Sequence, residues 1–92
     1  MRKSDGIHPA IRMYGVDWCG DTTRARALLD DLDIEYNYYD VDKDAAMART
    51  AMSLQNGGEK KPVLDFSEGV ILIEPNNQEI HDALEKTGRV LV

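Results

Sequence analysis

The stretch YGVDWCGDTTRAR, residues 14–26, holds the one cysteine of the 92-residue chain, Cys19. Apolar residues lead into this stretch. From Thr22 to Leu32 the residues are good helix formers, with apolar side chains three and four positions apart. The stretch therefore predicts the end of a β-strand followed by a helix that begins close to the cysteine. Thr22 stands three residues after Cys19, where a second cysteine would complete a redox pair.

The rest of the chain continues the same alternation of strands and helices. The patterns predict strands at 10–16, 34–41, 62–66 and 70–74, and helices at 22–32, 42–55 and 75–88. Asn76 followed by Glu79 predicts a capping box at the start of the last helix, and Gly88 a stop at its end. The order βαβαββα predicts an α/β fold with a four-stranded mixed sheet flanked by three helices. We expect a single domain over 1–92, with its core at about 10–87 and terminal extensions at 1–9 and 88–92.

Composition and charge restrict the function classes. A net charge of −6 disfavours binding to nucleic acid and to anionic membrane surfaces. The longest aliphatic run, VILI at 70–73, is far shorter than the roughly 20 residues of a membrane span, and the N-terminus lacks the apolar core of a signal peptide. A single cysteine excludes an intramolecular disulfide, so we expect a reducing, cytoplasmic setting. We also expect a monomer.

Two patterns that suggest metal binding fail on inspection. The acids at 40, 42 and 44 begin like a calcium loop, but Ala45 and Ala51 occupy the positions of its glycine and its last ligand. His8 and His81 are far apart in sequence and show no ligand spacing. We therefore expect no metal site.

The apolar end GRVLV is expected to pack on the domain or to form an oligomer contact.

The position of Cys19 suggests chemistry. Active groups gather at the carboxyl ends of parallel strands, and a helix N-terminus favours the anionic thiolate, which is the nucleophile. Arg24 adds positive charge nearby, whereas Asp17 and Asp21 oppose it, so the sequence leaves the net effect open. The alternative is a lone cysteine that acts only as a small buried apolar side chain. The polar surroundings favour a functional thiol, and Thr22 is within reach to donate its hydroxyl to the sulfur.

Four segments together resemble a known family. They are YGVDWCGDTTRAR, YYDVDKD, NGGEKKPVLDF and LIEPNNQEI, in this order. The chain resembles a glutaredoxin of the thioredoxin-like superfamily over about residues 10–86. It is most similar to short bacterial glutaredoxins of the mycoredoxin type, with a monothiol Cys-Gly-Asp-Thr site. The resemblance implies a minimal thioredoxin-like fold.

The resemblance also implies roles for individual residues. Cys19 falls on the nucleophile and Thr22 on the resolving cysteine, whose sulfur is absent. Pro62 matches the cis-proline of the family. Asn76 and Asn77 lie at the N-terminus of the last helix, where backbone N–H groups of the family bind a ligand carboxylate.

The surroundings of the implied site depart from the family in part. Lys60 and Lys61 replace the Thr-Val pair that usually precedes the proline, and Val16 replaces a common lysine. The two lysines could bind the terminal carboxylate of a ligand, or they could be solvated loop charges. We expect Trp18 to shield or present the substrate, and Asp17 and Arg24 to border it.

The implied activity is thiol–disulfide exchange without a bound cofactor. A monothiol enzyme acts on mixed disulfides between a protein and a small thiol of the glutathione or mycothiol type, because the second thiol comes from solution. One alternative is a non-catalytic binding or regulatory module on the same fold. Another is an iron–sulfur cluster shared by two chains, which the acid beside the site disfavours.

Overall fold

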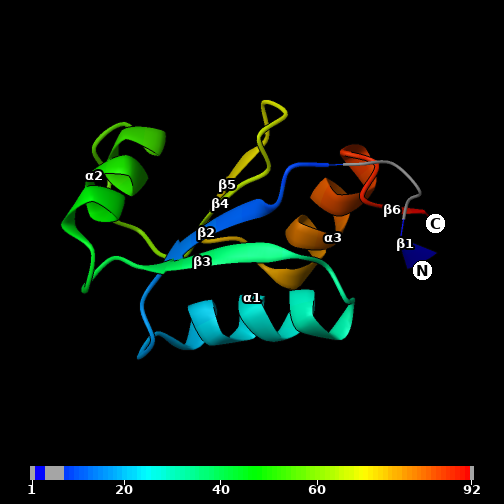
Figure 1. Cartoon of the computed structure of the whole chain (residues 1–92), viewed down its shortest axis with the longest axis horizontal. Coiled ribbons are helices and arrows are strands. Elements are labelled where there is room, and N and C mark those ends of the chain that lie inside the picture. The colour runs from blue at the N-terminus through cyan, green and yellow to red at the C-terminus, as the bar shows by residue number, and fades with distance from the viewer. Residues whose placement is uncertain (1, 4–7, 92) are drawn as a thin grey trace.

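The computed structural model describes residues 2–3 and 8–91 and contains a four-stranded mixed sheet (Figure 1). The strands are β2 (Ile11–Gly15), β3 (Tyr36–Asp40), β4 (Val63–Asp65) and β5 (Ile71–Ile73), in the order β3-β2-β4-β5. β2 and β3 run parallel, whereas β2–β4 and β4–β5 are antiparallel pairs. The predicted order of elements and the mixed sheet are confirmed.

Three helices cover the two faces of this sheet. They are α1 (Gly20–Asp31), α2 (Ala45–Leu54) and α3 (Asn77–Lys86). Apolar residues of α1 and α3 share one core cluster with the sheet, and α2 contributes to a second cluster on the other face (Figure 1). The predicted capping box of α3 is present: Asn76 Oδ1 accepts from the Glu79 N–H, and Glu79 Oε1 accepts from the Asn76 N–H.

The larger core lies between the sheet and the helices α1 and α3. Its fully buried side chains include Leu29 of α1, Met13 of β2 and Leu84 of α3. The smaller core packs Ala51 of α2 against Tyr14 and Val63. The apolar residues that these helices pack into the two cores lie three or four positions apart, as the helical periodicity of the sequence predicts.

The chain ends form an element that the sequence pattern did not predict. β1 (Arg2–Lys3) and β6 (Val90–Leu91) pair as a two-stranded antiparallel sheet, and Figure 1 shows these two strands next to each other. Val90 is buried in the larger core, so this part of the apolar C-terminal segment packs on the domain. Residues 1, 4–7 and 92 of the expected extensions lie outside the described residues.

Arg89, next to β6, connects the C-terminal segment with the rest of the domain through hydrogen bonds. Its guanidinium is almost fully buried and donates to the carbonyls of Pro9 and Phe66, at 2.8 and 2.9 Å.

Across the described ranges, none of the helices is long and apolar enough to cross a membrane.

Candidate functional site: a single thiol at the start of α1

Cys19 lies at the start of α1, after the loop that follows β2. Its backbone is extended (φ −86°, ψ 125°), and it is the N-cap residue of the helix. The Cys19 N–H donates to the Val16 carbonyl, and the Cys19 carbonyl accepts from the Thr23 N–H, at 3.2 and 3.0 Å. The thiol is partly exposed. A free thiol therefore stands where the first N–H groups of a helix lack intrahelical partners and favour an anion.

Thr22 is packed beneath the thiol loop, which we define as residues 16–19 between β2 and α1. It is fully buried, and its hydroxyl oxygen accepts from the Val16 N–H at 3.4 Å. A Cβ on Gly15 would lie 2.6 Å from two Thr22 side-chain atoms, so the glycine makes this close packing possible. Within the described part of the chain, no hydrogen bond joins Thr22 to the Cys19 sulfur, and the expected donation by its hydroxyl stays a prediction.

Asp17 turns toward β3 and the turn that follows it. Its carboxylate accepts from the Tyr38 hydroxyl at 2.8 Å and from the Lys43 ammonium at 3.0 Å. These two partners, Tyr38 first, hold the pKa of Asp17 below its usual value. The guanidinium of Arg26 stacks over the Tyr38 ring at 3.8 Å. The negative charge of Asp17 is therefore paired within the protein.

Trp18 projects into solvent beside the thiol, with 76% of its surface exposed. Its indole N–H donates to Asp42 Oδ2 at 2.7 Å. Asp40 connects the thiol loop with the turn that follows β3. One of its carboxylate oxygens accepts from the Asp17 N–H and the other from the Asp42 N–H. The orientation of the exposed indole is thus fixed by the turn after β3.

The sequence pattern indicates only a strand end and a helix start for the acids at 40–44. Asp44 does cap α2, since its side chain accepts from the Met47 N–H. Asp40, Asp42 and Lys43 have the further role of holding the thiol loop. Their position follows from the parallel pairing of β2 with β3, which brings the carboxyl ends of both strands to the same edge of the sheet.

Arg24 joins α1 to the start of α3. Its guanidinium donates to Asn77 Oδ1 at 2.7 Å and to the Pro75 carbonyl at 2.9 Å. A third contact, at 3.2 Å, pairs it with Asp21, so the second acid near the thiol is also neutralised. Arg24 and Asn77, which we expected at the substrate, are engaged with each other.

Pro62 stands at the same end of the sheet as the thiol loop. The Lys61–Pro62 peptide bond is cis, as the resemblance implied. Val63 pairs with Tyr14 of β2, and the Pro62 carbonyl accepts from the Glu74 N–H at 2.8 Å. Pro62 is therefore anchored between β2 and the residues that lead into α3.

The two lysines before Pro62 differ in their contacts. The backbone of Lys60 exchanges two hydrogen bonds with the Gln55 side chain, both at 3.0 Å. The Lys61 ammonium donates to the Glu59 carbonyl at 3.0 Å. The side chain of Asn76 is occupied by its capping box. Of the residues expected to bind a substrate, Trp18, Lys60 and Lys61 thus keep side chains that reach solvent or a loop surface.

The site has the parts of a thiol-exchange centre. It combines an accessible sulfur, a helix N-terminus and a cis-proline segment at the same end of the sheet. Among the described residues, no group of three or more His, Cys, Asp or Glu side chains could hold a metal ion.

Known proteins are similar to this chain in sequence and in fold. Two curated proteins of Mycobacterium tuberculosis, from strains CDC 1551 / Oshkosh and ATCC 25618 / H37Rv, are named for the glutaredoxin family. Each is 29% identical to this chain over 80 residues, which is 87% of this chain and 95% of the relative. The crystal structure of a glutaredoxin from Archaeoglobus fulgidus superposes with a TM-score of 0.70 at 17% identity. The match covers 84% of this chain and 86% of that one.

The sequence model of the glutaredoxin family matches residues 11–71, which extend from the start of β2 to the start of β5 and include Cys19 and Pro62. This range is more than half of the chain, and it contains three of the four segments on which the resemblance was based, whereas LIEPNNQEI at 72–80 lies beyond it. The chain belongs to the glutaredoxin family.

Proposed function

We propose that the protein is a monothiol thiol–disulfide oxidoreductase that acts on mixed disulfides between proteins and a low-molecular-weight thiol. The observation that carries the proposal is the partly exposed Cys19 at the N-cap of α1, beside the cis-Pro62 segment. Members of the glutaredoxin family are typically enzymes of this reaction type. The buried Thr22 supports a cycle that uses one protein sulfur, because the position of a resolving cysteine carries a hydroxyl.

The reaction consists of two exchanges. The Cys19 thiolate attacks the small-thiol sulfur of the mixed disulfide, the old S–S bond breaks, and the substrate protein leaves as a thiolate. A second small thiolate then attacks the small-thiol sulfur on Cys19, which restores the Cys19 thiolate and releases the small-thiol disulfide. In sum, one mixed disulfide and one free small thiol become one free protein thiol and one small-thiol disulfide, so the number of disulfide bonds is unchanged and the free small thiol is the reductant.

The co-substrate of this proposal is a small thiol of the glutathione or mycothiol type, with no tightly bound cofactor. The partners are proteins that carry such a thiol on cysteine, and the enzyme works as a monomer in a reducing compartment such as the cytoplasm. The reducing compartment keeps Cys19 as a thiol and supplies the second thiol.

Turnover of defined mixed disulfides tests the proposal. Glutathione and mycothiol mixed disulfides of one small protein are offered to the wild type and to Cys19→Ser, with release of the free protein thiol as the signal. We expect turnover by the wild type with at least one of them, and only the uncatalysed rate with Cys19→Ser. A substrate with an internal disulfide should be reduced poorly, because Cys19 has no resolving partner in the chain.

Two results separate this proposal from a non-catalytic module. Equal rates for the wild type and Cys19→Ser would contradict the enzyme and favour a binding function. The alkylation rate of Cys19 as a function of pH gives an independent measurement. A thiol that reacts no faster than a free cysteine at neutral pH would also count against catalysis.

A further inference from the structure

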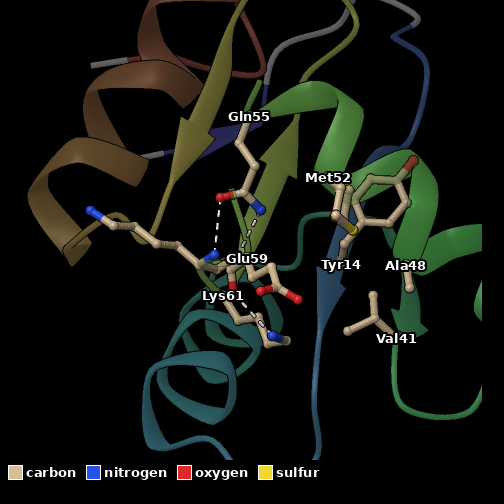
Figure 2. A pocket seen from close by; sticks show the side chains of 9 residues that line it. Tyr14, Val41, Ala48, Met52, Gln55, Glu59 and Lys61 are labelled. Atoms are coloured by element: carbon tan, nitrogen blue, oxygen red, sulfur yellow. Dashed lines mark hydrogen bonds between the residues drawn. The ribbon is translucent and has the colours of Figure 1, made fainter. Parts of the chain in front are cut away.

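A small pocket opens between α2 and the loop of residues 55–61, which leads into Pro62 (Figure 2). Its floor is apolar and is formed by Tyr14, Val41, Ala48, Ala51 and Met52. The cavity volume is about 50 Å³, far below the roughly 300–1,000 Å³ of pockets that hold drug-sized ligands. The pocket therefore has room for the end of one aliphatic side chain.

Internal contacts keep this pocket open. The ring of Tyr14 stacks on Tyr39 with centroids 5.4 Å apart, which fixes the floor. The Gln55 side-chain amide donates to the Lys60 carbonyl and accepts from the Lys60 N–H. The Gly57 N–H donates to the Met52 carbonyl at 2.7 Å. Figure 2 shows Gln55 reaching across to the loop next to Glu59 and Lys61. Because these contacts already order the loop, the protein loses little conformational entropy when a ligand binds.

The rim of the pocket carries an unbalanced positive charge. Glu59, Lys60 and Lys61 form it. Ion pairs within the described residues involve Arg24, Arg26, Lys43 and Arg89 among the cations, but neither of these lysines. In a chain with a net charge of −6, two adjacent lysines without an acidic partner form a local site for an acidic group.

The pocket reaches the cis-proline segment through one residue. Lys61 lines the pocket and also forms the cis peptide with Pro62. Across the described residues, no backbone hydrogen bond reaches the Lys61 N–H or carbonyl. An extended segment of a substrate can pair with these two groups as a strand does, and alternate side chains of such a segment then point toward and away from the pocket.

We propose that this pocket selects the protein substrate. An aliphatic side chain close to the modified cysteine enters the pocket, and an acidic residue of the same segment pairs with Lys60 or Lys61. The partner is therefore a protein whose mixed disulfide lies in an acidic segment with an aliphatic residue. This inference rests on the proposed function and adds a substrate class to it.

Four peptides test the two halves of the inference. Each contains one cysteine in a mixed disulfide with the same small thiol, flanked by Leu and Glu, Ser and Glu, Leu and Lys, or Ser and Lys. We expect the Leu–Glu peptide to have the highest kcat/KM. Exchange of Leu for Ser should lower it about tenfold. Exchange of Glu for Lys should lower it about threefold to tenfold, and less at high salt, because the contact is at the surface.

Two pairs of variants locate the effect. Ala48→Leu fills the pocket, whereas Ala46→Leu makes the same change on an exposed position of α2. Lys60→Glu reverses a rim charge, whereas Arg49→Glu does so at an exposed position of α2 outside the pocket. Ala48→Leu should abolish the Leu-over-Ser ratio, and Lys60→Glu should invert the Glu-over-Lys ratio. Both ratios compare peptides on one preparation, so a loss of folded protein cancels.

Each outcome decides for or against the pocket. Equal kcat/KM values for the four peptides overturn the inference and leave the proposed function standing. The inference is also overturned if each control changes a ratio as much as its partner. If no peptide is turned over, the proposed function fails, and binding of the reduced peptides to Cys19→Ser then decides. The same Leu–Glu preference in binding supports the pocket, and its absence overturns it.

Discussion

The two sides of the thiol site differ in how their polar groups are used. On the side of α1, β3 and α3, Asp17, Trp18 and Arg24 all bond to other parts of the chain. On the side of α2, the loop backbone is fixed by Gln55, but the charges of Lys60 and Lys61 have no acidic partner in the described part of the chain. The first side is closed by internal contacts, whereas the second side keeps two positive charges without an acidic partner among the described residues.

The largest effect is expected where the first side is packed most closely. In Gly15→Ala, the new Cβ would lie 2.6 Å from Cγ2 and Oγ1 of the fully buried Thr22. We expect the free energy of unfolding to fall by about 1–3 kcal/mol, because over-packing forces side chains and backbone to shift. Urea unfolding at neutral pH measures this loss. The start of α1 should be displaced with it, so alkylation of Cys19 should also change.

A double-mutant cycle checks the cause. Thr22→Ala removes both atoms at 2.6 Å and leaves only its Cβ, which is 3.2 Å from the new group. Gly15→Ala combined with Thr22→Ala should therefore destabilise by less than the sum of the single changes. Additive losses would show that the contact with Thr22 is not the reason for glycine at this position.

The course of the fold could be predicted from local patterns. Helix periodicity identified α1 and α2, and the Asn76–Glu79 pair identified the start of α3. α1 begins two residues before the predicted Thr22, because Gly20 and Asp21 follow an N-cap cysteine that carries no usual capping side chain. β1 and β6 were missed, since strands of two residues are too short to show an alternating pattern.

The candidate site could be predicted only in its central positions. Cys19 and the cis geometry before Pro62 followed from one local motif and a resemblance. The partners of Trp18 and Asp17 did not, because Asp42 and Lys43 are more than twenty residues away and act through the β2–β3 pairing. Local propensity contains no information about such contacts. The parallel strands, once recognised, would have indicated them.

An intermediate effect is expected on the second side of the site. Gln55→Leu removes both hydrogen bonds to the Lys60 backbone, and we expect a loss of about 1–2 kcal/mol in unfolding free energy. Amide hydrogen exchange at Lys60 should accelerate more than exchange in β2. Gln78→Leu is the matched control, since the Gln78 amide bonds only the exposed Asp82 side chain. If both variants accelerate Lys60 exchange equally, Gln55 does not fix the loop.

The smallest effect concerns the pH dependence of the Asp17 contacts. The pKa of Asp17 lies below its usual value of 3.8, mainly through the Tyr38 hydroxyl and then through Lys43. A carboxyl group with a lowered pKa stabilises the folded state above the unfolded value, and this contribution is lost as the pH falls below about 3.8 through the folded pKa. The stability difference between the wild type and Asp17→Asn should therefore be constant near neutral pH and shrink in acid.

NMR titration of the Asp17 carboxyl group resolves which partner dominates. Tyr38→Phe and Lys43→Met should each raise the pKa of Asp17 toward 3.8, because the Tyr38 hydroxyl bond is the largest single cause and Lys43 acts through both its hydrogen bond and its charge. Asp30→Asn, on the exposed surface of α1, should leave it unchanged. A larger shift in Lys43→Met would mean that the thiol loop is held by charge, which salt weakens. A larger shift in Tyr38→Phe means that a directed hydrogen bond holds the loop, and its geometry is then independent of ionic strength.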